Sequence, residues 1–459
     1  MADRYDVIVI GAGPAGENVA SRAAEGGLSA VVVEQELVGG ECSYWACIPS
    51  KALLRPGEAA RAAGRAAGVR PASIDVQEAL DHRDALVSNW DDKGQVEWLN
   101  SAEVGLLRGA GRIAGEQTVT VTGLDGAVME LTADKAVVIA TGSGPAMPPI
   151  DGLDSASAWN NRGATEAKAA PRRLAVLGGG TVGVEMAQAW KDLGSQEVTI
   201  IERNDRLLAN EEPFAGQHIA DIFKERGIDV RTGVQAESVR RQKGEVTVGL
   251  SDGTTVTADE LLVAVGRRPR TSDIGLDMVG LEPGKYIEVD DQLRATGVDG
   301  GWLYAVGDAN GRTLLTHTGK YQARIAADVI LGKDAKAWGD REAIPRVIFT
   351  DPHVAAVGLT EKQARDQGVN VRVVEYPFGG VAGATTIGSG IEGNCKLVVD
   401  DDRRVIVGAT FVGPGAGEMI HAATIAIIGK VTLDTLWHAI PSFPTVSEVW
   451  LRLLEKYGL

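Results

Sequence analysis

A strand, a glycine-rich turn, a helix and a second strand follow one another twice in this chain, and few folds accommodate that order. In residues 5–34, an apolar strand ending at Ile10 leads into the turn GAGPAG, an alanine-rich helix over 14–24 and a strand over 30–33. In residues 174–202, the strand LAVL, the turn GGGTVG, a helix through Leu193 and a strand over 198–201 repeat the pattern. Each copy reads as a parallel β-α-β unit. The repeat predicts two dinucleotide-binding domains.

The first turn carries its glycines at Gly11, Gly13 and Gly16. In this pattern the first glycine permits a tight turn, the second lets the backbone approach a pyrophosphate, and the third lets helix and strand pack closely. The helix amino terminus adds N–H groups and a positive dipole. Glu34 ends the second strand, about 20 residues beyond the turn, where a carboxylate can bind ribose hydroxyls. Together these residues predict a dinucleotide site.

The second turn carries its glycines at Gly178, Gly180 and Gly183. Its acid is Glu202, and a carboxylate there favours an unphosphorylated ribose, hence NADH over NADPH. Arg203 and Arg206 follow directly, and guanidinium groups could instead hold a 2′-phosphate. The alternative is that both arginines belong to a solvated loop.

The rest of the chain mixes helices and strands. Residues 52–100 read as helices, strand-like stretches follow near 104–122 and 134–141, and glycine and proline mark a junction at 143–150. Strand-rich sequence fills 228–264, and LLVAVGRRPR reads as one further strand. The strand in WLYAVGDANG delivers Gly307 and Asp308 to a helix that runs to about Leu331. The last part, with helices near 416–428 and 446–456, reads as a separate α+β domain. The predicted class is α/β, with two doubly wound Rossmann-like domains and a carboxy-terminal α+β domain.

Two of the three cysteines lie close together, in CSYWAC between Cys42 and Cys47. Positions i and i+5 of an ideal helix are separated by about 7.5 Å of rise, whereas a disulfide needs Cα atoms roughly 4.4–6.8 Å apart. A disulfide here requires a distorted backbone, and a strained, accessible disulfide is easily reduced. A zinc site would need two more ligands, and none of the six histidines is nearby in sequence, while two buried free thiols are a further alternative. Cys395 starts a strand and reads as a small packed residue.

The amino-acid composition limits the kinds of molecule that we expect this protein to bind. The chain has 62 acidic and 46 basic residues and a net charge of −16, without the clustered cations that nucleic acids or anionic membranes attract. Its amino terminus lacks the basic region of a signal peptide, and no run of about 18 apolar residues could span a bilayer. Three cysteines cannot build a disulfide framework. We expect a cytoplasmic protein that binds neither nucleic acid nor membrane, and no metal ligands.

The segment GGECSYWACIPSKALL at 39–54 resembles GGTCxNxGCxPSK, the active-site stretch of the pyridine nucleotide–disulfide oxidoreductases. That family includes dihydrolipoamide dehydrogenase, glutathione reductase and mercuric reductase. Further motifs follow in the family order along essentially the whole chain: ATGS at 140–143, VGRRP at 265–269, AVGDAN at 305–310, LTHTGKYQAR at 315–324, FTDPHVAAVGLTE at 349–361 and FPTVSE at 443–448. The resemblance implies an FAD-binding domain at 1–149 and 270–336, an NAD(P)-binding domain at 150–269, a dimerisation domain at 337–459, and a homodimer.

The resemblance also implies roles for individual residues. FAD would be held by Gly11, Gly13, Gly16, Glu34, Lys51, Thr141, Gly142, Gly307 and Asp308. NAD(P)H would be held by Gly178, Gly180, Gly183, Glu202, Arg203 and Gly266. Cys47 would face the flavin, Cys42 would attack the substrate, and Lys51 would pair with Glu185 beside the flavin. Without the family, Lys51 would read as a helix-surface lysine.

The chain departs from the family near its carboxy terminus. Family members have His-Pro-Thr-x-Ser-Glu, whose histidine acts as general base at the partner subunit's disulfide and is oriented by the glutamate. Here Phe443 occupies the histidine position, and Glu448 is retained. His438 lies five residues earlier and reads as a surface or helix-end residue, and Tyr44 between the cysteines offers only a weak acid. The loss matters because such proton transfer contributes typically 10²- to 10⁴-fold.

We therefore expect a dihydrolipoamide dehydrogenase-like enzyme that passes electrons from NAD(P)H through FAD and a redox-active Cys42–Cys47 disulfide to a disulfide or related acceptor. It would manage without the usual histidine, so ordinary dihydrolipoamide turnover should be poor. The main alternative is a diaphorase that reduces quinones or dyes at the flavin, with the cysteines as bystanders. Mercuric reductase is less expected, because the chain ends without that enzyme's carboxy-terminal cysteine pair. A non-catalytic redox sensor, or a binding subunit of a 2-oxoacid dehydrogenase complex, is the alternative outside catalysis.

Overall fold

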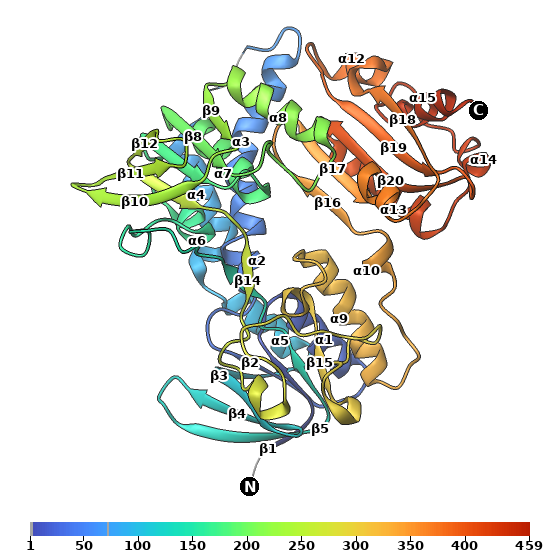
Figure 1. Cartoon of the computed structure of the whole chain (residues 1–459). Coiled ribbons are helices and arrows are strands. Elements are labelled where there is room, and N and C mark those ends of the chain that lie inside the picture. The colour runs from blue at the N-terminus through green and yellow to red at the C-terminus, as the bar shows by residue number, and fades with distance from the viewer. Residues whose placement is uncertain (1–2, 71–72) are drawn as a thin grey trace. The chain divides into compact units, whose positions relative to one another are not determined.

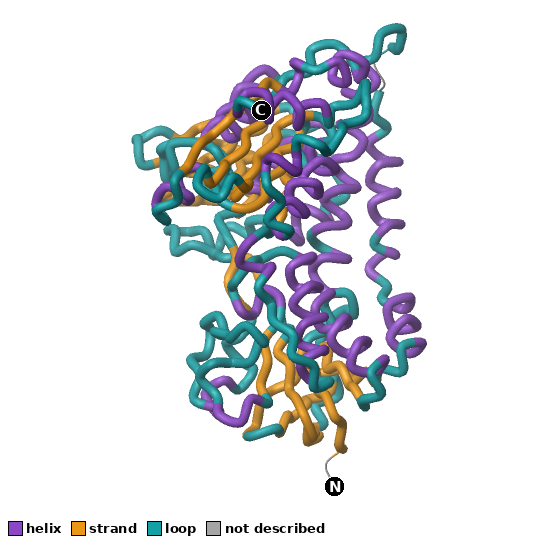
Figure 2. Tube along the Cα trace, turned by 90° about the vertical axis from the view of Figure 1, so that its right-hand side faces the viewer, coloured by secondary structure: helices purple, strands orange, loops and turns teal. Residues whose placement is uncertain are grey.

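The computed structural model describes residues 3–70 and 73–459, which fall into two compact units. Of the described residues, the first unit contains 3–49, 84–146 and 267–341, and the second contains 50–70, 73–83, 147–266 and 342–459. In both units strands assemble into sheets that helices flank (Figures 1 and 2).

The first unit is built on a largely parallel sheet. Its strands are β1 (Asp3–Ile10), β2 (Ala30–Glu34), β3 (Gly105–Gly115), β4 (Thr118–Gly123), β5 (Val128–Ile139) and β15 (Leu303–Ala305). The parallel order is β3-β2-β1-β5-β15, and β4 connects β3 to β5 as an antiparallel meander. Residues 7–10 of β1 are at most 3% exposed, as expected for a parallel strand covered on both faces. Helix α1 (Pro14–Glu25) packs against α9 (Thr316–Ile330).

Shorter elements complete the first unit. They are α2 (Gly40–Tyr44), η1 (Ser88–Trp90), α5 (Lys93–Ser101), β6 (Ser143–Pro145), β14 (Arg267–Pro269), η2 (Leu276–Val279), η3 (Asp299–Gly301) and η4 (Gly307–Asn310). Strands β6 and β14 pair antiparallel. The short helix α10 (Gly339–Glu342) lies where the chain leaves this unit.

The second unit contains a second parallel sheet, of order β13-β7-β8-β9. Its strands are β7 (Arg173–Leu177), β8 (Glu197–Glu202), β9 (Ile228–Thr232) and β13 (Glu260–Val263). An antiparallel sheet follows, of β10 (Ala236–Gln242), β11 (Glu245–Leu250) and β12 (Thr255–Ala258). The accompanying helices are α3 (Cys47–Arg65), α4 (Val76–Leu86), α6 (Asn161–Glu166), α7 (Thr181–Asp192) and α8 (Pro213–Glu225).

The carboxy-terminal part of the second unit is an antiparallel sheet of order β16-β17-β20-β19-β18. Its strands are β16 (Pro345–Ile348), β17 (His353–Gly358), β18 (Val371–Pro377), β19 (Asn394–Asp400) and β20 (Val405–Gly413). Its helices are α11 (Glu361–Asp366), η5 (Phe378–Gly380), α12 (Ala382–Ile387), α13 (Ala416–Ile428), α14 (Leu433–Leu436) and α15 (Glu448–Tyr457). Helix α13 packs on β17 and β20, which closes an apolar core.

The predicted fold class is confirmed, with two local corrections. The stretch LLVAVGRRPR forms two strands, β13 and β14, because Gly266 adopts φ +138° between them. The helix expected to follow Gly307 begins only at Thr316, because η4 ends at the left-handed Gly311, φ +72°.

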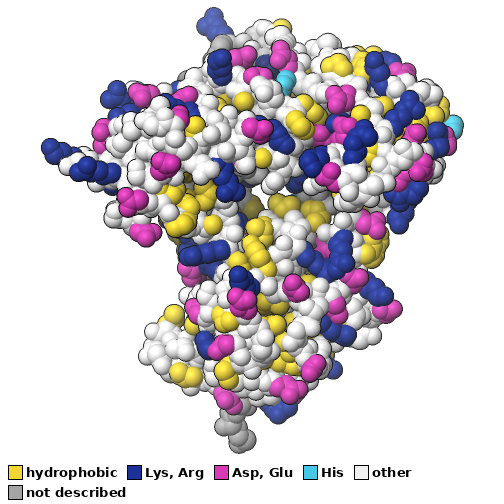
Figure 3. Space-filling view, viewed as in Figure 1, with side chains coloured by type: hydrophobic (Ala, Val, Ile, Leu, Met, Phe, Trp, Pro, Cys, Tyr) yellow, Lys and Arg dark blue, Asp and Glu magenta, His cyan; other side chains and the backbone are white. Residues whose placement is uncertain are grey.

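The surface agrees with the mixed charge of the sequence. On the face seen in Figure 3, Lys and Arg side chains intermingle with Asp and Glu. Among residues 3–70 and 73–459, no helix has the length and apolar character needed to cross a membrane.

Candidate active site

The first glycine-rich turn joins β1 to α1. Gly11 adopts φ +104°, and a Cβ at Gly16 would lie 1.9 Å from the carbonyl oxygen of Gly11, so the turn admits no side chain at either position. A Cβ at Gly13 would meet nothing within 4 Å, which leaves open space before the first turn of α1. Glu34 Oε2 accepts the N–H of Ala12 at 2.7 Å, and its Oε1 accepts the N–H two residues further on at 2.7 Å. The carboxylate is therefore fixed at the mouth of the turn.

The second glycine-rich turn, between β7 and α7, repeats this geometry. Gly178 adopts φ +105°, and a Cβ at Gly183 would lie 1.9 Å from its carbonyl oxygen. Glu202 Oε2 accepts the N–H of Gly179 at 2.6 Å, while Oε1 accepts the backbone and side-chain N–H groups of Asn204 at 2.7 and 2.6 Å. Two turns that are far apart in sequence thus have the same backbone geometry, which is the geometry of a dinucleotide-binding turn.

The two arginines after Glu202 have different surroundings. Arg206 donates to the carbonyl oxygen of Ala209 at 2.7 and 3.1 Å and to that of Glu211 at 3.2 Å, which commits its guanidinium to the loop. Arg203 is exposed. Of the two arginines, Arg203 is the more exposed.

A pocket in the first unit brings together most residues predicted to hold FAD. It is lined by Gly11, Gly13, Glu34, Thr141, Gly142, Gly307 and Asp308, and also by Cys42 and Thr316. Gly16 lies behind the turn, against Gly11, and Lys51 belongs to the second unit. Within the described residues, the buried hydroxyl of Thr141 has no hydrogen-bond partner. An unpaired hydroxyl, a glycine-lined turn with open space and a fixed acid at the strand end fit an adenine dinucleotide such as FAD.

Asp308 also lines this pocket. Burial raises the pKa of its carboxyl above the ordinary value, opposed by a hydrogen bond from Ser143 and by the Arg267 guanidinium, whose Nε lies 3.7 Å from Oδ2. Arg267 also donates to Ser143 Oγ at 2.6 Å. The carboxyl is thus tied to the strand pair β6 and β14.

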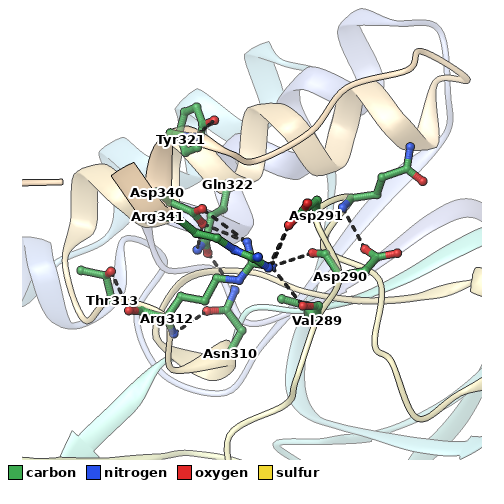
Figure 4. A network of polar contacts seen from close by, with 12 residues as sticks. Val289, Asp290, Asp291, Asn310, Arg312, Thr313, Tyr321, Gln322, Asp340 and Arg341 are labelled. Atoms are coloured by element: carbon green, nitrogen blue, oxygen red, sulfur yellow. Dashed lines mark hydrogen bonds and ion pairs between the residues drawn. The ribbon is translucent and has the colours of Figure 1, made fainter. Parts of the chain in front are cut away.

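A buried polar network holds the turn that carries Gly307 and Asp308 (Figure 4). Gln322 Oε1 accepts the N–H of Gly307 at 2.8 Å and the side-chain N–H of Asn310 at 2.9 Å. Gln322 Nε2 donates to Asp340 Oδ2 at 2.8 Å, and Arg312 reaches the same oxygen at 3.2 Å. Gln322 is fully buried, so these bonds are shielded from water and fix the turn firmly.

Cys42 and Cys47 flank an interruption of the helix. Helix α2 ends at Tyr44, Trp45 adopts φ −137°, and α3 begins at Cys47. This is the distortion that the spacing of the cysteines requires. The side chains of Cys42 and Cys47 hydrogen-bond to each other, so the interruption brings the two sulfur atoms together.

The surroundings of the dithiol set its proton affinity. The hydrogen bond with Cys47 and burial both raise the pKa of Cys42, while Thr316 and the charge of Lys320 lower it. Cys47 Sγ lies 3.4 Å from Thr316 Oγ1, at the start of α9. Burial raises the pKa of Tyr44 to about 12, so its phenol is a poorer acid than the sequence suggested.

Lys51 and Glu185 form the expected pair in the second unit. Lys51 Nζ lies 2.7 Å from Glu185 Oε2 and 4.7 Å from the centre of the Phe349 ring. Glu185 Oε1 accepts the N–H of Phe349 at 2.9 Å, and the residue is 3% exposed. Phe349 therefore contacts both members of the pair.

Helix α7 continues this polar contact along one face. Gln188 Oε1 accepts the N–H of Asp351 at 2.9 Å, and Asp192 accepts Arg61 Nη1 at 2.6 Å. Arg61 Nε also donates to Asp351 Oδ2 at 2.5 Å, and Arg65 reaches that oxygen at 3.1 Å. Asp351 thus joins α3, α7 and the turn after β16.

The carboxy-terminal stretch lies on the surface of the second unit. Phe443 is 75% exposed, in the loop between α14 and α15. Glu448 is buried at the start of α15, and its Oε1 accepts Arg452 Nη2 at 2.6 Å. His438 is exposed just after α14, as predicted. Cys395 is fully buried in β19, as predicted, and burial raises the pKa of its thiol.

Sequence reasoning missed three residues of the first unit: Thr316, which contacts Cys47, Gln322, which accepts the N–H of Gly307, and Glu17, which is buried in α1. Thr316 and Gln322 stand within or beside the quoted motif LTHTGKYQAR, but only their contacts reveal what they hold. The only sequence signal for Glu17 is an acid directly after the third glycine of the turn.

Two dinucleotide-binding turns, together with a cysteine pair at the edge of the first pocket, are the features of an oxidoreductase that binds two dinucleotides. The chain belongs to the pyridine nucleotide-disulphide oxidoreductase family: residues 5–323 match that family's model, and residues 344–453 match its dimerisation domain. It is an oxidoreductase, and the family implies FAD and NAD(P)H as cofactors.

Relatives that match along nearly the whole chain include a dihydrolipoyl dehydrogenase and a mercuric reductase. A dihydrolipoyl dehydrogenase of Thermus scotoductus is 35% identical over 464 residues, covering 98% of this chain and 97% of the relative. A mercuric reductase of Staphylococcus aureus is 31% identical over 453 residues, covering 97% of this chain and 81% of the relative.

Solved structures show the same fold. LpdA from Mycobacterium tuberculosis matches with a TM-score of 0.88 and 26% identity, covering 100% of both chains. The HOCl-induced flavoprotein disulfide reductase RclA from Escherichia coli, as its Cu(II) complex, matches with a TM-score of 0.87 and 25% identity, covering 99% of both.

Proposed function

We propose that this protein is an FAD-dependent NAD(P)H:disulfide oxidoreductase, similar to dihydrolipoamide dehydrogenase, that reduces a small-molecule disulfide or related acceptor without a histidine base. The observation that carries the proposal is the hydrogen-bonded dithiol of Cys42 and Cys47 beside the pocket of the first unit. The exposed Phe443 supports the absence of a histidine base, because it occupies the histidine position of the family.

Each group of residues would have its own role in the proposed reaction. The first turn and Glu34 would hold FAD at its adenosine and pyrophosphate end, and Asp308 would hold the other end. When bound, FAD supplies a two-electron carrier between NAD(P)H and the dithiol. Cys47, which contacts Thr316, would receive the electrons, and Cys42 would exchange with the acceptor. Lys51 and Glu185 would pair beside the flavin.

The surroundings of Glu202 favour NADH. Its carboxylate is 7% exposed and already accepts three N–H groups around the second turn. A 2′-phosphate beside it would face a fixed negative charge, and Arg206 is committed to the loop. Arg203 and Gly266 would complete the NADH site.

The proposed organisation assigns 1–149 and 270–336 to FAD, 150–269 to NAD(P)H and 337–459 to dimerisation. A homodimer is supported by the matched dimerisation domain, where Ile425, Ile440 and Phe443 are 57, 91 and 75% exposed. Covering such apolar side chains is what a second copy of the chain would do. We place the enzyme in the cytoplasm, since its reactive thiols need a reducing compartment.

An anaerobic NADH titration followed by absorbance tests the proposal. A long-wavelength band from a thiolate beside the oxidised flavin would show that electrons reach the dithiol. Replacing Cys42 and Cys47 by Ser should abolish disulfide turnover and leave dye reduction intact. Plain bleaching of the flavin, with quinone reduction as the only activity, would favour the diaphorase alternative and contradict the proposal.

A further inference from the structure

A group of ion pairs on the pocket of the first unit has no role in the proposed chemistry. Arg270 follows β14, and its guanidinium binds two carboxylates. Nη2 donates to Glu41 Oε1 at 2.9 Å, and Nη1 donates to Glu36 Oε2 at 3.3 Å. All three residues line the pocket. One guanidinium thus joins two acids of the segment that follows β2.

Arg270 itself belongs to the wall of the pocket that β6 and β14 form. Its backbone N–H donates to the carbonyl oxygen of Gly142 at 3.0 Å, and a Cβ at Gly144 would lie 3.5 Å from its Nε. The base of the side chain is therefore fixed to this wall. Arg267, at the start of β14, adds a longer ion pair in the same direction, with Nη2 3.9 Å from Glu41 Oε2.

The two acids belong to the wall that carries the first glycine-rich turn. The N–H of Glu36 donates to Oε1 of Glu34, the acid at the end of β2, at 2.7 Å. Glu41 lies in α2, next to Gly40, where a Cβ would lie 2.9 Å from the Cα of Gly13. The bonds of Arg270 therefore join two walls of the pocket that come from distant parts of the sequence.

Water reaches these ion pairs. The side chains of Arg270, Glu36 and Glu41 are 33, 41 and 17% exposed. Ion pairs that are partly exposed are individually weak, and dissolved salt screens them. Such bonds break and re-form readily, so they suit a closure that opens better than a permanent anchor of the fold.

The sequence around Glu41 departs from the family at this point. The family stretch has GGTC where this chain has GGEC, so Glu41 stands in the position of a threonine. A threonine hydroxyl is uncharged and cannot form an ion pair with a guanidinium. The pairing of Arg270 with this position is therefore a property of this chain and is not supplied by the family motif.

We propose that Arg270, Glu36 and Glu41 form a clasp across the FAD pocket that has to open for FAD to enter or leave. This inference rests on the proposed function, because it takes FAD as the occupant. FAD would extend from the first glycine-rich turn towards Asp308 and Cys42, which line the same pocket, and would pass between the walls that the clasp joins. Breaking the clasp lowers the barrier in both directions. Entry and release should then accelerate by the same factor, and the Kd for FAD should stay unchanged.

The test measures how fast the holoenzyme exchanges its FAD. Radiolabelled FAD bound to the protein is chased with unlabelled FAD to give the release rate, and equilibrium dialysis gives the Kd. Arg270→Gln removes both pairs and should release FAD about 3- to 30-fold faster, and Glu41→Gln about 2- to 5-fold faster, each with the Kd of the wild type. The matched control is Arg268→Gln, at an exposed arginine of β14, which should release FAD at the wild-type rate.

Two further measurements examine the clasp itself. Raising NaCl from about 20 mM to about 1 M should accelerate release from the wild type, and it should do so less in Arg270→Gln, which has no ion pair to screen. Arg270→Lys keeps the charge but lacks the planar fork that binds two acids at once, so its release rate should lie between those of the wild type and Arg270→Gln.

The outcomes separate the clasp from a direct contact with the cofactor. A Kd that rises in step with the release rate in Arg270→Gln would show that the guanidinium binds FAD itself and would overturn the clasp. Slower release from Glu41→Gln would also overturn it, because the freed arginine would then be holding the cofactor. Release at the wild-type rate from all variants would overturn the inference alone. A wild type that binds no FAD would overturn the proposed function itself.

Discussion

The burial of Glu17 predicts how stability depends on pH, independently of any activity. Its carboxyl has a pKa raised from 4.5 to about 7 in the folded chain. A change of one pKa unit corresponds to 1.36 kcal/mol, so the difference amounts to roughly 3 kcal/mol. The folded state binds this proton more tightly than the unfolded state does. The stabilisation is complete below pH about 4.5 and is lost as the pH rises through about 7.

The substitution Glu17→Gln removes this titration and keeps the shape of the side chain. Its free energy of unfolding should therefore approach that of the wild type at pH 5 and exceed it by up to roughly 3 kcal/mol at pH 8. Denaturant unfolding of the FAD-loaded protein, followed by tryptophan fluorescence, measures the difference at each pH. The exposed Glu25→Gln should show no such divergence. A constant difference between Glu17→Gln and the wild type from pH 5 to 8 would refute the reasoning, because Glu17 would then ionise as an exposed glutamate does.

Three further substitutions test other parts of the site. Phe443→His should raise steady-state turnover of lipoamide by up to about 10²-fold if the missing base limits it, and an unchanged kcat would count against that limit. Asp351→Asn should lower the free energy of unfolding by roughly 3–5 kcal/mol, because Asp351 is the buried carboxylate shared by Arg61, Arg65 and Arg226, whose positive charges it offsets; a loss below 1 kcal/mol in urea unfolding would contradict this. Gln322→Leu should weaken FAD retention about 5- to 100-fold, since the buried N–H of Gly307 loses its acceptor. Flavin release on dilution measures the effect, and wild-type retention would speak against the role of the network.

Local signals in the sequence were enough to predict the two dinucleotide-binding units. The turns, the strands before them and the acids after them depend on backbone conformation and short-range periodicity, which neighbouring residues dictate. The predicted fold class is correct for this reason, and the errors fall where elements meet. The helix after Gly307 begins only at Thr316, because a left-handed glycine intervenes.

The sequence by itself determined the fold class, the family resemblance and the helix distortion that the spacing of Cys42 and Cys47 demands. Only the tertiary structure brought Lys51 to 2.7 Å from Glu185, Thr316 to 3.4 Å from Cys47 and Gln322 to the N–H of Gly307. Only the tertiary structure removed Glu17 from water. The physical reason is that a pKa depends on desolvation and on charges from every element packed around a group. The residues next to Glu17 in the sequence do not show which other elements pack around it, so its pKa could not be predicted from the sequence.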